Sequence, residues 1–132
     1  MYNLLDRFII LNGIYDILCA LSIMKYIPFF SYFHLSMIED YDYNNELFER
    51  FFAYWIFTYG IIRLVFYDNY NIIGFTYCIE AILFARETYV SQTIVPYRGN
   101  FVILSCILLT YLCFIQYQSH QSHDIVCDRK RI

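Results

Sequence analysis

The sequence has few charged residues, few lysines and no recognisable catalytic pattern. Only 16% of its 132 residues are charged, the net charge is −3, and Lys25 and Lys130 are its lysines. No broad basic face for nucleic acid is therefore expected. The five cysteines form no CxxC pair, so a disulfide framework is not expected either. The sequence has no Ser/His/Asp order, phosphate-binding glycine loop or paired-histidine helix motif, which disfavours an enzyme and a cofactor.

What the sequence does have is apolar and aromatic side chains. Hydrophobic residues make up 60% of the chain and aromatic residues 22%, against roughly 45–50% apolar residues in typical soluble domains. The mean hydropathy is +0.44. A soluble domain this small cannot hide so much apolar surface in its own core. The composition therefore predicts a membrane protein, with the lipid bilayer as a partner.

Four apolar runs are long enough to be membrane spans, which need about 20 residues or slightly fewer. They predict an all-α, integral membrane four-helix bundle that forms a single domain. The polar turn "DNYN" at 68–71 predicts that the second and third spans form an antiparallel hairpin. The predicted spans are 8–24, 51–67, 72–90 and 101–117.

Two segments lie outside these spans. The aromatic segment 27–38 is too short to span and is expected to lie along the membrane surface. The polar tail 118–132 is expected to be unstructured. It carries an H-x-x-H-D-x-x-C pattern that starts at His120 and nominally has metal ligands, but no metal site is expected in such a tail.

The basic residues bear on topology and on a localisation in the endoplasmic reticulum. An even number of spans puts both termini on one side, and five basic residues against four favour the cytosol for that side. The end of the chain, Arg129-Lys130-Arg131-Ile132, is similar to a dibasic retrieval signal. A basic tail that touches anionic headgroups is the alternative. A second alternative is that the first span is a signal peptide cleaved near Ala20.

Polar residues recur at one depth in three of the predicted spans. When antiparallel spans are aligned, Asp16, Tyr59 and Glu80 fall at the midpoints of the first three spans. Each has a polar neighbour four residues away, which places the two on one helix face. These residues are expected to converge on an interior site: Asn12, Asp16, Tyr59, Arg63, Thr76 and Glu80.

The cost of burying charge predicts how this site is arranged. A charged residue at a helix centre costs about 2.5–3.5 kcal/mol on insertion scales, so facing lipid unpaired is unfavourable. Arg63 can hold the Glu80 carboxylate with its planar guanidinium, while Asp16 shares Arg63 or is protonated. Such a site either fixes helix register or serves in proton relay, ion coupling or headgroup binding.

A second polar layer is expected at the headgroup level, near the open end of the hairpin. Two opposite-sign pairs would meet there and fasten the second and third helices together; a solvated surface cluster is the alternative. The residues are Glu49, Arg50, Arg86 and Glu87.

The stretch "RFFAYWIFTYGIIR" resembles a known family. The ergosterol biosynthetic protein 28 family has an Arg, Phe, Trp and Ile-Arg pattern on one helix, and a Glu followed six residues later by Thr on the next. Leu83 stands where that family has a histidine. The matching residues are Arg50, Phe52, Trp55, Ile62, Arg63, Glu87 and Thr93. The resemblance implies a four-helix protein of the endoplasmic reticulum that tethers sterol C4-demethylation enzymes without catalysing a reaction.

Three functions follow as expectations. The first is a non-catalytic scaffold or assembly subunit, whose partners are other membrane proteins or further copies of itself. The second is a small transporter or lipid-binding protein built around Asp16, Arg63 and Glu80. The third is a structural membrane protein of a virion or an organellar complex.

Overall fold

The computed structural model is all-helical, which confirms the all-α part of the expected fold. It describes residues 3–39 and 45–129, with side chains described as far as residue 121. Within these ranges the only strand-like feature is one isolated bridge. The helices are α1 (Leu4–Ile23), α2 (Ser31–Leu35), α3 (Glu46–Val65), α4 (Tyr70–Tyr89) and α5 (Pro96–Arg129).

Asparagine caps set the beginning of three of the long helices. The side chains of Asn3, Asn45 and Asn69 each accept a hydrogen bond from a backbone N–H in the first turn. Such caps satisfy donors that the helix leaves unpaired. These helices therefore begin two to five residues before the apolar runs that predicted them.

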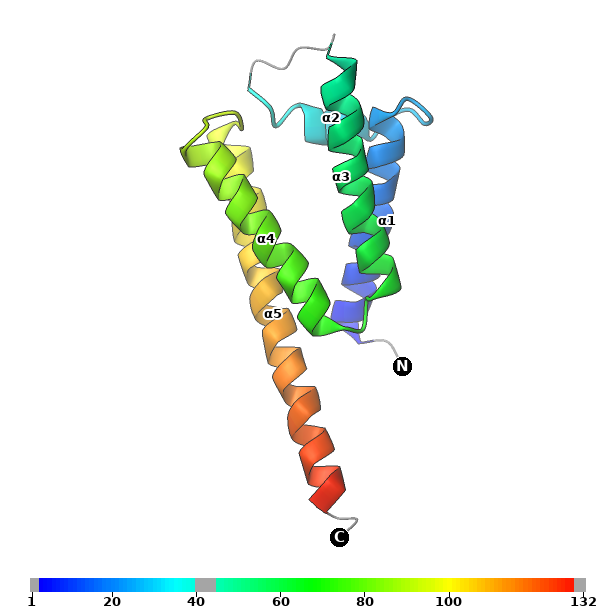
Figure 1. Ribbon diagram of the computed structural model, residues 1–132, viewed down its shortest axis with the longest axis vertical. Coiled ribbons are helices and arrows are strands. Elements are labelled where there is room, and N and C mark those ends of the chain that lie inside the picture. Colours follow the sequence, from blue (N-terminus) through cyan, green and yellow to red (C-terminus); the bar gives the residue numbers. More distant parts are fainter. Residues whose placement is uncertain (1–2, 40–44, 130–132) are drawn as a thin grey trace.

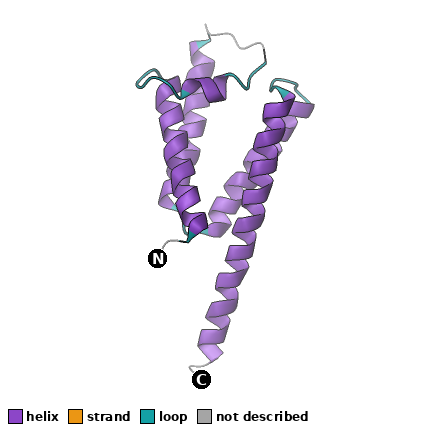
Figure 2. Cartoon of the chain, turned by 180° about the vertical axis from the view of Figure 1, so that it is seen from behind, coloured by secondary structure: helices purple, strands orange, loops and turns teal. Residues whose placement is uncertain are grey.

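The long helices form two pairs that diverge from one end, so that the molecule is V-shaped (Figure 1). α1 packs along α3, and α4 packs along α5, whereas α3 and α4 touch only sparsely. The expected α3–α4 hairpin is therefore closed only near its turn. α1 and α4 both run away from that turn, in the same direction (Figures 1 and 2).

Two glycines bring α1 and α3 into backbone contact. A Cβ atom at Gly60 would lie 2.9 Å from the Gly13 carbonyl oxygen, and one at Gly13 would lie 3.0 Å from the Gly60 carbonyl oxygen. Above this crossing, Cys19, Ala20 and Ala53 are fully buried. Small residues let helix backbones approach closely, as they do in membrane bundles.

The α4–α5 pair also uses small residues, and a Cβ atom at Gly99 of α5 would lie 2.1 Å from Oγ1 of Thr88 in α4. A Cβ atom at Gly74 would lie 3.1 Å from Cβ of Cys113. Thr110 donates a hydrogen bond to the Cys106 carbonyl in its own helix, at 2.8 Å. The opposite face of α5 is covered by exposed apolar side chains, such as Phe101 and Leu104.

α2 packs against α1 at the wide end of the V (Figure 1). The Ser22 hydroxyl accepts hydrogen bonds from the backbone N–H groups of Phe30 and Ser31, at 3.1 and 3.0 Å, and so fixes the beginning of α2 on α1. The chain after α2 then forms an antiparallel bridge between Ile38 and Ile94, which links it to the α4–α5 loop. The aromatic segment 27–38 therefore joins the two helix pairs.

α5 is longer than its apolar part. It begins at Pro96, whose missing N–H is no loss in a first turn, and continues to Arg129. The prediction that 118–132 is unstructured is therefore wrong as far as Arg129. Polar residues mark the end of an apolar run, but they do not end a helix, because most of them cost less than about 1 kcal/mol in a helix interior.

One helix in the described ranges is apolar and long enough to cross a membrane on its own. It is α5, over Pro96–Gln121. The other three long helices have 20 residues each, about 30 Å, but carry several charged residues.

Candidate functional site: a buried ion cluster and an apolar cavity

Arg63 lies at the centre of a buried ion cluster. Its guanidinium contacts the Asp16 carboxylate from α1 and the Glu80 carboxylate from α4. The Arg63 side chain is 2% exposed, against 8% for Asp16 and 21% for Glu80. Arg63 thus pairs with both carboxylates. The sequence predicts an Arg63–Glu80 pair and, as one option for Asp16, that it shares Arg63. Both arrangements are present together.

Two tyrosine rings complete the surroundings of the guanidinium. The Arg63 carbon Cζ lies 4.2 Å from the centre of the Tyr77 ring and 5.4 Å from that of Tyr59. Asn12 donates a hydrogen bond to the Tyr77 hydroxyl at 2.9 Å. These contacts favour a charged guanidinium, because aromatic faces attract cations. Thr76, by contrast, bonds to the Ile73 carbonyl of its own helix and not to the cluster.

The cluster is the innermost of three polar contacts between α1 and α4. Nearest the turn, the Tyr70 hydroxyl donates to Asp6 at 2.5 Å, and next comes the bond between Asn12 and Tyr77. Asp16 and Glu80 then meet through Arg63. Partners are separated by 64 or 65 positions throughout, so the two parallel helices keep one register. We call these three contacts the polar ladder.

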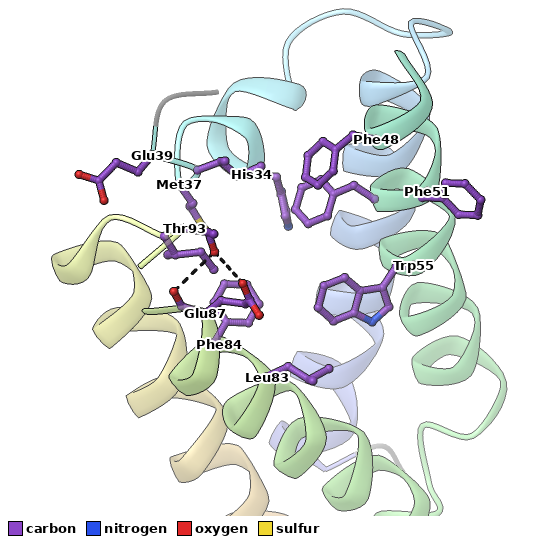
Figure 3. A pocket seen from close by; sticks show the side chains of 13 residues that line it. His34, Met37, Glu39, Phe48, Phe51, Trp55, Leu83, Phe84, Glu87 and Thr93 are labelled. Atoms are coloured by element: carbon purple, nitrogen blue, oxygen red, sulfur yellow. Dashed lines mark hydrogen bonds between the residues drawn. The ribbon is translucent and has the colours of Figure 1, made fainter. Parts of the chain in front are cut away.

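Above the polar ladder the two helix pairs separate around a cavity of about 580 Å³ (Figure 3). This volume lies within the range of roughly 300–1,000 Å³ that is usual for small-molecule pockets. Its walls are mainly apolar and include Phe52 and Trp55 of α3 and Leu83 and Phe84 of α4. A smaller cavity of about 30 Å³ lies between it and the ion cluster, and is lined by residues of both.

The polar groups of the large cavity lie at its α2 end. There Glu87 accepts a hydrogen bond from the Thr93 hydroxyl at 2.7 Å (Figure 3). His34 also lines the cavity, and its Nδ1 is buried without a hydrogen-bond partner. Burial lowers the pKa of His34 to about 4, so the imidazole is neutral near pH 7. Glu39 lies at the same end and is exposed.

The residues that carry the family resemblance gather mostly around this cavity. Phe52, Trp55, Glu87 and Thr93 line it, although their two segments lie some 30 positions apart. Arg63 belongs to the ion cluster instead. The two others lie outside the cavity lining: Ile62 packs against the core near Tyr70, and Arg50 is exposed.

The charged layer expected at the open end of the hairpin does not form across α3 and α4. Glu49 pairs with Lys25 at the end of α1, at 3.6 Å, and Arg86 pairs with its neighbour Glu87 at 3.1 Å. The expectation that these residues fasten the two helices is wrong, because the cavity and α2 separate α3 from α4 at this level.

Sequence reasoning missed Tyr77, Tyr70 and His34. Tyr77 lies three positions before Glu80, on the same helix face, so its spacing was a usable signal. Tyr70 and His34 gave no such signal, because each depends on packing between distant segments. The pattern beginning at His120 has partners whose side chains lie outside the described residues; among described side chains, no three potential metal ligands cluster.

Comparison of the chain with protein-family models, with curated proteins and with solved structures found no match.

Proposed function

We propose that the chain is a non-catalytic scaffold protein with four membrane spans, formed by α1, α3, α4 and α5. The observation that carries the proposal is an inverted distribution of polarity. Arg63 is the largest of the fully buried side chains, while large apolar residues such as Phe75 and Leu104 are more than 60% exposed. Lipid favours such an arrangement, because charges there must pair inside the bundle and apolar groups need no cover.

A role as scaffold is supported by where the remaining surface lies. Most of the described chain lies in α1, α3, α4 and α5, so partners can meet much of its surface inside the membrane. The outward face of α5 offers a row of exposed apolar residues for this contact: Phe101, Leu104, Leu108 and Tyr111. The resemblance described above adds the specific proposal that the partners are sterol C4-demethylation enzymes of the endoplasmic reticulum.

The test is purification of the tagged chain from native membranes in mild detergent, with stoichiometry measured by mass spectrometry. We expect membrane enzymes in substoichiometric or equal amounts, and loss of them when Phe101, Leu104 and Leu108 are changed together to alanine. Ile82→Ala, on the exposed face of α4, is the matched control. Recovery of the chain alone contradicts the scaffold role.

The same purification separates the other candidates. A structural subunit of a virion or an organelle would appear in fixed ratio in one particle. A transporter that uses the ion cluster would lose function with Asp16→Asn or Glu80→Gln while its assembly stayed intact. A scaffold should keep its partners when Asp16, Arg63 and Glu80 are all replaced by neutral residues of similar size, because the cluster then serves only to join helices.

A further inference from the structure

We propose that the cavity between α3 and α4 binds a lipid alcohol, with the hydroxyl head beside Glu87 and His34 and the apolar body against Trp55 and Phe52. This site is distinct from the ion cluster, and it does not depend on which proteins the chain assembles with.

The polar groups of the cavity gather toward one end of it. Glu39, His34 and Thr93 lie at the α2 end, whereas Leu83 lies deeper, below Glu87 and nearer the level of the ion cluster (Figure 3). If the long helices span the membrane, the polar end lies near the headgroups and the apolar end near the midplane. An amphiphile already oriented in the bilayer fits this cavity without being inverted.

The polar end of the cavity is negatively charged. Among the described residues, two carboxylates, Glu39 and Glu87, line the cavity and no lysine or arginine does. A phosphate headgroup would be repelled there, since like charges at close range are unfavourable. Arg86 lies outside the lining and already contacts Glu87 at 3.1 Å, which offsets part of the negative charge. An anionic head is therefore disfavoured.

One imidazole nitrogen that lines the cavity lacks a hydrogen-bond partner. Nδ1 of His34 is buried and has no hydrogen-bond partner, although buried polar atoms normally have one. A neutral imidazole has one donor and one acceptor, and a carboxylate only accepts. A hydroxyl group can donate to a carboxylate and can either donate to or accept from an imidazole nitrogen, whereas an ether, an ester or a hydrocarbon has no donor.

The aromatic rings in the apolar wall of the cavity pack against one another. The Phe48 and Phe52 rings are stacked, with centres 5.7 Å apart, and the Phe52 and Trp55 rings meet edge to face at 6.2 Å. These rings support one another, so the wall is formed without a ligand. Preformed apolar walls with few polar groups are usual in small-molecule sites.

The test uses the full chain in nanodiscs and a hexadecanol that carries a diazirine and an alkyne. We expect ultraviolet labelling to map to peptides that contain Trp55 or Leu83. Labelling should fall at least fivefold in Leu83→Trp, which fills the cavity without removing a contact. Phe101→Trp, on the outward face of α5, is the control and should label like the parent chain.

Competition by unlabelled lipids identifies which head group and which apolar body the cavity binds. Unlabelled hexadecanol should compete at a concentration at least fivefold lower than its methyl ether, which cannot donate a hydrogen bond, and Glu87→Ala should remove that difference. Competition by cholesterol instead of hexadecanol would still support the proposal and would define the body as polycyclic. Equal competition by alcohol and ether, tighter binding of hexadecylamine, or unchanged labelling in Leu83→Trp would overturn it. These outcomes leave the purification test of the scaffold role unaffected.

Discussion

The two ends of the V use the same helices in opposite ways. At the closed end, near the α3–α4 turn, α1 and α4 are joined by the polar ladder, and a glycine crossing brings α1 against α3. At the open end, the separated helices are connected by α2 and one backbone bridge. The closed end thus has directional bonds between neighbours, while the open end has an apolar cavity. The comparison indicates that specific polar bonds hold the helices together at the closed end, whereas the helices enclose a cavity at the open end.

The largest expected effect comes from removing the cation at the closed end. Arg63→Met leaves Asp16 and Glu80 buried together without their partner, and breaking a buried ion pair costs about 3–5 kcal/mol. Thermal unfolding in detergent measures the loss. Adding Asp16→Asn and Glu80→Gln to Arg63→Met should recover most of it, because no uncompensated charge then remains. If Arg63→Met alone unfolds like the parent chain, the cluster does not hold the closed end together.

The next effect tests the glycine crossing. In Gly60→Ala the new methyl group would lie 2.9 Å from the Gly13 carbonyl oxygen and 2.8 Å from Ile17, so α1 and α3 must move apart. Overpacking of this kind costs about 1–3 kcal/mol. Gly74→Ala is the matched control on α4, where the nearest atom is 3.1 Å away, and should cost less. Equal losses in the two variants would show that α1 and α3 are no tighter at Gly60 than α4 and α5 are at Gly74.

Acid should weaken the open end. The pKa of His34 is about 4 in the fold against 6.5 for an exposed histidine, so between these values the unfolded chain binds more protons. Stability is therefore complete above pH 6.5 and falls as the pH drops toward 4, by about 2 kcal/mol at pH 5. Unfolding of the parent chain and of His34→Gln, compared across this range, measures the effect. A parallel pH dependence in the two proteins would assign it to other groups.

The smallest effect concerns one step of the polar ladder. Tyr77→Phe keeps the ring beside Arg63 but removes the hydroxyl that accepts from Asn12 at 2.9 Å. Loss of one hydrogen bond costs about 1 kcal/mol. Asn12→Ala combined with Tyr77→Phe should cost little more than either change alone, because both remove the same bond. Strictly additive losses in this double-mutant cycle would contradict the contact.

The closed end could be predicted from the sequence, and the open end could not. Asp16, Arg63 and Glu80 are charges in apolar runs, and helix spacing alone places them at one depth. The separation of α3 from α4 depends on backbone bonds near Ile38 and Ile94, and backbone bonds leave no pattern of residue types. The error over Glu49 and Arg86 has the same origin, since a straight hairpin was assumed where α2 intervenes.

The length of α5 has a consequence for the surroundings of its last turns. α5 has 34 residues against 20 in α4, and the extra 14 extend it by about 21 Å beyond the closed end. If the 20-residue helices match the bilayer, the last turns of α5 lie in the aqueous phase, well beyond the roughly 8 Å Debye length over which charged headgroups act at physiological salt. The backbone of these turns is then reached from the adjoining compartment and not from within the bilayer.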